Sequence, residues 1–246
     1  MTVVSHVEGP RGDRLVYAKT SGRGPCVVFL SGYRSDMEGT KAVHLEGWAK
    51  SEGRAFLRLD YAGHGQSGGV FEEGCIGDWA ADAEAVIADA VPGPVVLVGS
   101  SMGGWIASIL SKRLPQIAGF VGIAAAPDFT EDGFWAGFSE QARRQVMQEG
   151  KILMPSAYED PYVVTRKLIE DGRRNLVLRS PLPMNWPVRL LQGTQDEAVS
   201  RETALRLLDH IEGPDVRLTL VKGADHRFST PACLTQIERA IREVLG

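Results

Sequence analysis

Six short apolar runs recur along this chain, and longer segments with helical periodicity separate them. The runs are rich in valine, leucine and isoleucine, the composition of strands that are buried on both faces of a sheet. Such strands alternating with helices predict a mostly parallel central sheet flanked by helices. Functional groups of such sheets gather beyond the carboxyl ends of the strands. The expected strands are Cys26–Leu30, Ala55–Leu59, Val95–Val98, Phe120–Ile123, Val188–Leu191 and Val216–Val221.

Two segments carry an apolar stripe at helical spacing. One runs from Ile76 to Ala90, between the second and third expected strands, and the other from Leu234 to Val244. A stripe of this kind places the apolar face of a helix against the sheet. Nothing resembling a linker divides the 246 residues, so we expect a single domain over residues 1–246.

The segment from about residue 127 to residue 187 interrupts the alternation, because a connection between two strands normally needs far fewer residues. We predict that it forms a small cap, inserted before the penultimate core strand on the side of the sheet where functional groups gather. Helices are expected over Glu140–Gln148 and near Val163–Glu170. The large apolar side chains of this segment either line an apolar substrate channel or pack the cap onto the body. They are Phe129, Phe134, Trp135, Phe138, Met147, Met154 and Tyr158.

Ser101 lies at the centre of a G-x-S-x-G pentapeptide, Gly99–Gly103, which follows the third apolar run and precedes a helical stretch. In this strand-turn-helix context the pentapeptide predicts a nucleophile elbow, a strained turn that exposes the serine. Gly99 and Gly103 remove side chains that would crowd the turn. Ser101 is therefore the candidate catalytic nucleophile.

A serine hydroxyl needs a neighbouring base, and that base needs a carboxylate to orient it. With such an elbow the chain order is serine, acid, histidine. His226 follows the last expected strand and is the candidate base. Of the other histidines, His64 is expected to order a loop. The remaining ones precede the sheet or lie in helical patterns, namely His6, His44 and His210.

Asp196 is the candidate acid, because it lies just past the strand that ends near Leu191, where a turn can direct it toward His226. Asp128, one strand earlier, and Glu197 are rivals. Asp225 is adjacent to His226 in sequence, and adjacent side chains usually point apart.

Acyl transfer also requires two donors for the negative charge that develops on the carbonyl oxygen. One should be the backbone N–H of Met102, which follows the nucleophile at the start of a helix. The other should come from the loop after the first expected strand. We favour the N–H of Tyr33, with Gly32 allowing close approach and the amide of Arg34 as an alternative.

The net charge of −4, with both signs interspersed, gives no basic stripe for nucleic acid and no polybasic segment for a membrane surface. The three cysteines show no C-x-x-C spacing, so we expect reduced thiols and no metal site. The sequence carries no signal-peptide pattern and no apolar run of membrane-spanning length. We expect a cytoplasmic protein with small-molecule substrates and without a cofactor.

The chain resembles the serine α/β-hydrolases over nearly its whole length. More narrowly, it is similar to the family of the mitochondrial palmitoyl-protein thioesterase and acyl-glucuronide esterase with its bacterial relatives. The resemblance implies an α/β-hydrolase fold and triad positions at Ser101, Asp196 and His226. It also implies cleavage of acyl thioesters or esters, including S-palmitoyl groups on proteins. It rests on five blocks in order: Phe29–Tyr33 with Met37–Ala42, Arg58–Gly63, Val98–Trp105, Arg189–Gly193 and Asp225–Arg227.

The sequence departs from many α/β-hydrolases at Ser31, where they have histidine before the glycine of the oxyanion loop. Two other functions fit the same residues: a serine peptidase on this fold, and a ligand-binding homologue that lacks catalysis. A dehalogenase is disfavoured because its covalent chemistry uses a carboxylate at the position of Ser101.

Overall fold

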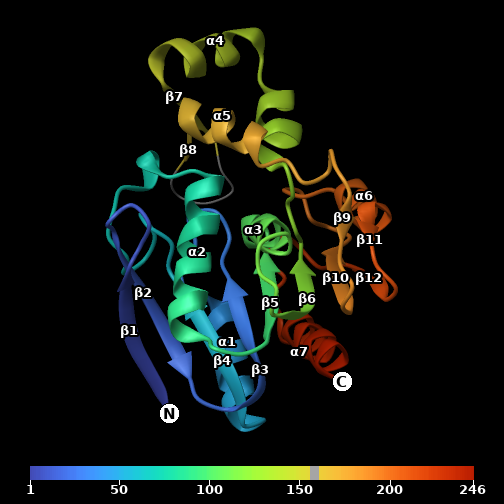
Figure 1. Cartoon of the computed structure of the whole chain (residues 1–246). Coiled ribbons are helices and arrows are strands. Elements are labelled where there is room, and N and C mark those ends of the chain that lie inside the picture. The colour runs from blue at the N-terminus through green and yellow to red at the C-terminus, as the bar shows by residue number, and fades with distance from the viewer. Residues whose placement is uncertain (156–160) are drawn as a thin grey trace.

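One central sheet organises the computed structural model, which describes residues 1–155 and 161–246 (Figure 1). Its strands are β1 (Thr2–Glu8), β2 (Arg14–Thr20), β3 (Arg23–Leu30), β4 (Arg54–Leu59), β5 (Val95–Ser100), β6 (Ile117–Ile123), β10 (Val188–Gly193) and β12 (Val216–Val221). They lie in the order β1-β2-β4-β3-β5-β6-β10-β12, and β2 runs antiparallel to both of its neighbours. The other pairs are parallel. The mostly parallel sheet and its six expected strands are therefore confirmed.

Strands β1 and β2 extend the sheet beyond the prediction. β1 is an edge strand in which half-buried and exposed residues are mixed, and β2 has charged residues at Arg14 and Lys19. Antiparallel strands of this kind mix polar and apolar residues, whereas continuous apolar runs are typical of strands that are buried on both faces. The sequence pattern therefore identified the parallel core but not its antiparallel edge.

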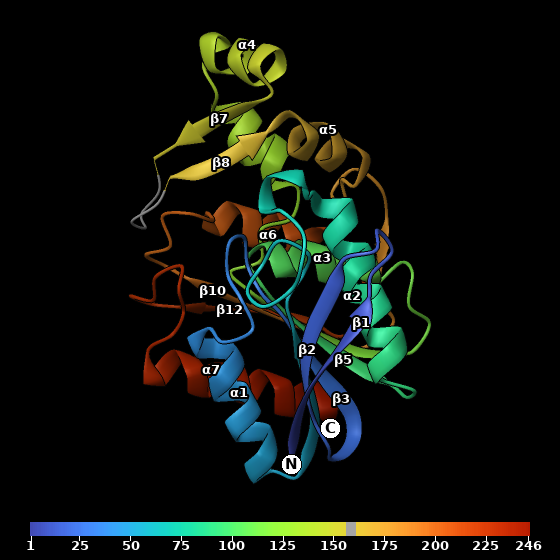
Figure 2. The same ribbon diagram turned by 90° about the vertical axis from the view of Figure 1, so that its left-hand side faces the viewer.

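Helices cover both faces of the sheet (Figure 2). On one face α1 (Thr40–Ser51) and α7 (Pro231–Leu245) share an apolar core with β3, β5 and β6. On the other face lie α2 (Ile76–Ala90) and α3 (Met102–Leu110). The predicted stripe of α2 is buried at every position, and α7 begins at the side-chain cap of Thr230 with Pro231 in its first turn. Both predicted helices are confirmed.

The insertion before the penultimate core strand forms the upper part of the molecule in Figure 1. It contains the π-helical turn η2 (Thr130–Trp135), α4 (Glu140–Glu149), the antiparallel pair β7 (Lys151–Met154) and β8 (Tyr162–Thr165), and α5 (Arg166–Arg174). We call these elements the cap. The remaining elements lie outside it: η1 (Phe71–Glu73), β9 (Leu182–Pro183), α6 (Arg201–His210) and β11 (Ile211–Glu212).

One predicted cap helix is confirmed and the other begins later than expected. The helix near Val163–Glu170 starts only at Arg166, because Tyr162–Thr165 is strand β8. Three consecutive β-branched residues, from Val163 to Thr165, favour the strand. The Thr165 hydroxyl then accepts the Leu168 N–H at 3.0 Å and caps the helix that follows.

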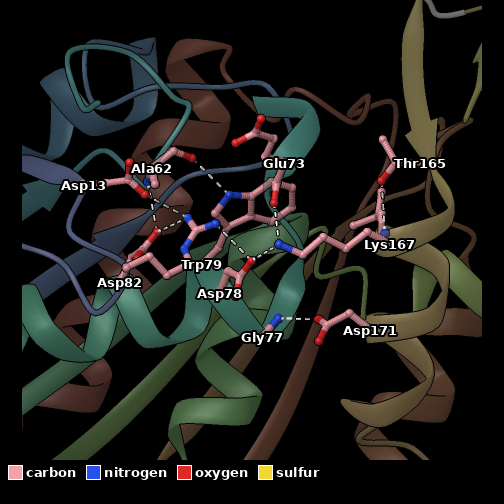
Figure 3. A network of polar contacts seen from close by, with 12 residues as sticks. Asp13, Ala62, Glu73, Gly77, Asp78, Trp79, Asp82, Thr165, Lys167 and Asp171 are labelled. Atoms are coloured by element: carbon pink, nitrogen blue, oxygen red, sulfur yellow. Dashed lines mark hydrogen bonds and ion pairs between the residues drawn. The ribbon is translucent and has the colours of Figure 1, made fainter. Parts of the chain in front are cut away.

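Helix α5 of the cap is bound to the N-terminal end of α2 in the body (Figure 3). The Lys167 ammonium donates to the Glu73 carbonyl at 2.5 Å and to Asp78 Oδ2 at 2.7 Å. Asp171 Oδ1 accepts the Gly77 N–H at 2.7 Å. The N-cap residue of α2, Cys75, makes no capping bond of its own. A carboxylate from another element therefore satisfies the start of α2, where negative charge is favoured.

Strand pairing aligns the carboxyl ends of the central strands. Leu30 of β3 pairs with Gly99 of β5, and Ser100 of β5 pairs with Ile123 of β6. Ile123 in turn pairs with Leu191 of β10. The loops that follow these four strands consequently open at the same edge of the sheet.

Candidate active site

Ser101 occupies the turn between β5 and α3 with φ 54° and ψ −118°, a conformation that residues other than glycine rarely adopt. Its backbone N–H donates to the Ile123 carbonyl at 2.9 Å, and its carbonyl accepts the Ala126 N–H at 3.0 Å. The last residue of β6 and the loop after it thus hold both backbone groups of the strained residue.

The two glycines of the pentapeptide lie where no side chain fits. A Cβ atom on Gly99 would lie 2.4 Å from the Gly103 carbonyl oxygen, and one on Gly103 would lie 2.0 Å from the Leu30 carbonyl oxygen. Both contacts are with backbone, which cannot move aside as the end of a side chain can. The close approach of β3, β5 and α3 therefore requires glycine at both positions.

The side chains of Ser101, His226 and Asp196 meet at the carboxyl edge of the sheet. His226 Nε2 lies 3.1 Å from Ser101 Oγ, and His226 Nδ1 lies 2.9 Å from Asp196 Oδ2. The Asp196 side chain is fully buried, whereas that of His226 is 22% exposed. The loops after β5, β10 and β12 supply the three groups. A histidine between a hydroxyl and a buried carboxylate can accept the hydroxyl proton while the carboxylate stabilises the imidazolium.

Asp196 is held by donors on both carboxylate oxygens. Oδ1 accepts the backbone N–H groups of Ala198 at 2.9 Å and Val199 at 2.8 Å, and Oδ2 accepts from His226 and from Gln192 Nε2 at 2.9 Å. Burial by itself raises the pKa of Asp196, but the bond to His226, its charge and the other donors outweigh it, so the pKa is lowered. The carboxylate is therefore ionised at neutral pH.

Gln192 is a contributor to the site that the sequence analysis missed. Its side chain is completely buried at the end of β10 and also donates to the Val199 carbonyl at 2.9 Å. It thus fixes both the acid and the turn that carries it. A polar side chain at the carboxyl end of a strand that is buried throughout is the sequence signal that points to it.

The rival acids have other surroundings. Asp128 Oδ1 accepts the Val177 N–H at 2.8 Å, while Oδ2 accepts the Leu178 N–H at 3.0 Å and Arg179 Nη1 at 2.9 Å. These bonds tie the loop after β6 to residues 177–179, which follow the cap in the chain. Glu197 and Asp225 are exposed, and Asp225 Oδ1 accepts the Phe228 N–H within its own loop.

The other histidines also have structural surroundings. His64 is 4% exposed, its Nδ1 lies 3.3 Å from the Ala62 carbonyl, and burial lowers its pKa to about 4. It is therefore neutral at pH 7 and fixes the loop after β4, as expected. His44 contacts Glu238, His210 contacts the Ser180 carbonyl, and His6 lies in β1.

Two backbone N–H groups near Ser101 are candidates for oxyanion donors. Within residues 1–155 and 161–246, neither the N–H of Met102 nor that of Tyr33 donates to a protein acceptor. Met102 opens α3, and a Cβ atom on Gly32, next to Tyr33, would lie 3.4 Å from Ser101 Cβ. Unbonded donors beside a serine can bind a developing oxyanion. The amide of Arg34, in the same turn, remains the alternative.

A cavity of about 280 Å³ opens at Ser101. The cap contributes Tyr162 to its described lining, and the body contributes Tyr33 together with the charged residues Asp36, Lys41 and Arg227. Burial lowers the pKa of Lys41 to about 8, with Arg227 acting in the same direction and Asp225 opposing it. The Lys41 ammonium donates to the Arg227 carbonyl at 2.5 Å. This part of the site is more polar than the predicted apolar channel.

The predicted cap side chains chiefly pack. The rings of Phe129 and Phe134 lie against each other and against Tyr33, and Phe129 also contacts Trp105. Trp135 packs on Phe138, which is buried. Met147 and Met154 are half-buried, and Tyr158 lies outside the described residues.

The described residues were also compared with the requirements of a metal site and of a membrane-spanning helix. The described part of the chain holds no group of three or more potential metal ligands. None of its described helices is both long and apolar enough to cross a bilayer.

Comparison with known proteins gives close matches over the whole chain. A family model described as "Alpha/beta hydrolase family" matches residues 27–233. The mitochondrial palmitoyl-protein thioesterase ABHD10 of Bos taurus is 34% identical over 250 residues, which cover 99% of this chain and 80% of that protein. The Homo sapiens protein of the same name is 34% identical over 247 residues, with the same coverage.

Solved structures agree in fold. A hydrolase from Agrobacterium vitis S4 superposes with a TM-score of 0.94 at 37% identity, covering 100% of this chain and 99% of that one. Mouse alpha/beta hydrolase domain-containing protein 10 gives a TM-score of 0.90 at 32% identity, covering 98% and 97%.

Proposed function

This chain belongs to the alpha/beta hydrolase family, and from this membership we propose that it is a serine hydrolase that cleaves acyl thioesters or carboxylic esters. The relatives named palmitoyl-protein thioesterase support hydrolysis of thioesters or esters. We further propose that Ser101 is the nucleophile and that the reaction passes through an acyl-enzyme. The observation that carries it is the pair of contacts of His226, with Ser101 Oγ at 3.1 Å and with Asp196 Oδ2 at 2.9 Å.

In the first step His226 Nε2 accepts the Ser101 proton as Oγ bonds to the substrate carbonyl carbon. The carbonyl oxygen becomes an oxyanion, which the N–H groups of Met102 and Tyr33 bind. The tetrahedral intermediate collapses, the bond to the leaving sulfur or oxygen breaks, and His226 returns its proton to that atom. The product of this step is an acyl group on Ser101.

In the second step water replaces the leaving group. His226 deprotonates the water as its oxygen bonds to the acyl carbon, and the collapse of the second intermediate returns the proton to Ser101 Oγ. Asp196 accepts the His226 Nδ1–H throughout and offsets the positive charge of the imidazolium. Its lowered pKa supports this role, because it keeps the carboxylate charged at neutral pH.

We propose small-molecule acyl esters or thioesters as substrates, and S-acylated proteins as a further class. The thioester part draws on the relatives named palmitoyl-protein thioesterase. This chemistry requires no metal or organic cofactor. The cytoplasmic location stays a prediction, since the names of the thioesterase relatives carry the word mitochondrial.

Two competing functions share these residues: a serine peptidase and a ligand-binding protein without catalysis. A peptidase would cleave an amide of the same acyl group, whereas a binding protein would leave Ser101 unreactive. The rate of amide cleavage distinguishes the peptidase from the proposed hydrolase, and the reactivity of Ser101 distinguishes the binding protein from it.

The test compares the wild type, Ser101→Ala and Ser108→Ala on one acyl group presented as a thioester, an oxygen ester and an amide. Ser108 is a matched control, because it is buried in α3 and its hydroxyl donates only within that helix. We expect Ser101→Ala to lose at least about 10³-fold in kcat/KM and its fluorophosphonate labelling, and Ser108→Ala to retain both. Activity retained in Ser101→Ala contradicts the proposal, and cleavage of the amide above both esters favours the peptidase. Extending the panel from acetyl to palmitoyl thioesters then measures the preferred chain length.

A further inference from the structure

The turn that carries one candidate oxyanion donor is strained. Residues 32–35 form a turn after β3 in which the Ser35 N–H donates to the Gly32 carbonyl at 3.1 Å. Arg34, at its third position, has φ 57°, in the left-handed region that favours glycine. A side chain in this conformation persists only where the surroundings hold it. The turn therefore needs support from other parts of the molecule.

Two side chains of this turn donate to the same segment of the cap. The Tyr33 hydroxyl donates to the Val163 carbonyl at 2.6 Å, and Arg34 Nη1 donates to the Pro161 carbonyl at 2.6 Å. Val163 belongs to β8, which pairs with β7 along one edge and presents carbonyls along the other. The cap thus supplies the acceptors, and the turn supplies the donors.

The ring of Tyr33 is packed between the body and the cap. It lies edge-on to Phe71 and Trp79 of the body, with ring centres 5.0 and 6.0 Å away. On the cap side it lies edge-on to Phe129 and Tyr162, at 5.8 and 5.7 Å. Burial also raises the pKa of Tyr33, so its hydroxyl stays protonated and remains a donor. The side chain therefore has one fixed orientation.

The same strand reaches the cavity at Ser101. Tyr162 of β8 and Tyr33 both line it, and Gly32 lies against Ser101. The Tyr33 hydroxyl is already bound to β8, so the group of Tyr33 that can serve the oxyanion is its backbone N–H. A displacement of β8 would move the Tyr33 side chain and, with it, the backbone of the turn that lies beside Ser101.

We propose that the Tyr33 hydroxyl is a positioning group, which fixes the oxyanion donor of the turn by binding the Val163 carbonyl of the cap. This inference rests on the proposed function, in which the Tyr33 N–H binds the oxyanion. Its consequence is that the placement of the cap sets the rate of acyl transfer as well as access to the site.

The test is Tyr33→Phe, with Tyr17→Phe as the matched control. Tyr17 is a buried residue whose hydroxyl also donates at 2.6 Å, but to Asp89 of α2 in the body. The readouts are kcat and KM for a short-chain thioester, and the inhibition constant of a trifluoromethyl ketone, which forms an oxyanion on a serine. We expect Tyr33→Phe to lower kcat about 10-fold and to weaken the ketone by a similar factor, with KM nearly unchanged. Tyr17→Phe should change neither.

Arg34→Met provides a second variant, expected to move kcat and the ketone in the same direction but less. If Tyr33→Phe matches Tyr17→Phe in kcat and ketone binding while Ser101→Ala is inactive, the inference is wrong and the proposed function stands. A rise in KM with kcat unchanged also overturns it, because the hydroxyl would then serve substrate binding. Should Tyr33→Phe fail to fold, an Arg34→Met variant with full ketone affinity rejects the inference. Activity in Ser101→Ala would instead reject the proposed function.

Discussion

Asp196 and Asp128 are two buried carboxylates that follow neighbouring strands of one sheet, and their surroundings differ. Asp196 presents Oδ2 to His226, and its pKa is lowered. Asp128 binds two backbone N–H groups and Arg179 at the base of the cap, and burial outweighs these bonds so that its pKa is raised. Position at the carboxyl edge is thus not sufficient for a catalytic acid. The contact with His226, which the loop after β12 brings to the carboxylate, is what makes Asp196 the proposed catalytic acid.

The largest expected effect separates these two residues by activity. Asp196→Asn should lower kcat by about 10³- to 10⁴-fold, because an amide neither stabilises the imidazolium nor holds the required tautomer of His226. Asp128→Asn should lower kcat less than about 10-fold in the folded protein, because Asp128 binds the chain segment that follows the cap and does not contact His226. Steady-state kinetics on an ester substrate measures both, and circular dichroism checks that each variant is folded. Equal losses in the two variants would remove the functional distinction.

A second contrast compares a glycine of the turn at Ser101 with a glycine of the cap. Gly103→Ala should destabilise the protein by about 3 kcal/mol or more, because its Cβ atom would lie 2.0 Å from the Leu30 carbonyl oxygen. Gly137→Ala, in the exposed chain between η2 and α4, has no atom within 4 Å of its Cβ position and should change stability by less than about 0.5 kcal/mol. Urea unfolding measures both. A tolerated Gly103→Ala would show that the elbow can relax.

The sheet edge and the cap also differ in how far the sequence predicts them. The six apolar strands were predictable because burial on both faces leaves a continuous apolar run. The proximity of Ser101, Asp196 and His226 was predictable because an elbow of this kind has partners in a known chain order. The roles of Asp128 and Asp171 depend on contacts with residues about fifty to ninety positions away. Such pairings arise from tertiary packing and leave no local pattern. The start of α5 was missed for a local reason, since the β-branched run of Val163–Thr165 formed a strand.

A third prediction gives the two carboxylates opposite pH dependences of stability. The lowered pKa of Asp196 means that its ionisation stabilises the fold above the unfolded value near 3.8, and this contribution is lost as the pH falls through the folded pKa. The raised pKa of Asp128 means that its ionisation opposes folding, so stability falls as the pH rises from 3.8 through the folded pKa.

Unfolding free energies between acidic and neutral pH test these signs. The stability advantage of the wild type over Asp196→Asn should grow as the pH rises, whereas its advantage over Asp128→Asn should shrink. Slopes of the same sign would mean that the two carboxylates experience similar environments after all.

The smallest expected effect concerns the contact of α5 with the body. Lys167→Met removes the bonds to the Glu73 carbonyl and to Asp78, yet the Lys167 side chain is 48% exposed, so solvent screens the interaction. We expect a loss of only about 0.5 kcal/mol in global stability. Amide hydrogen exchange in α5 should accelerate while exchange in β5 stays unchanged, because the cap can open without unfolding the sheet. Lys112→Met, which removes an exposed contact with Ser180, is the control and should leave α5 unchanged. Equal acceleration of amide exchange in α5 and β5 would mean that the cap and the sheet unfold as one unit. Asp196 and Asp128 would then belong to a single cooperative structure, in spite of their different partners.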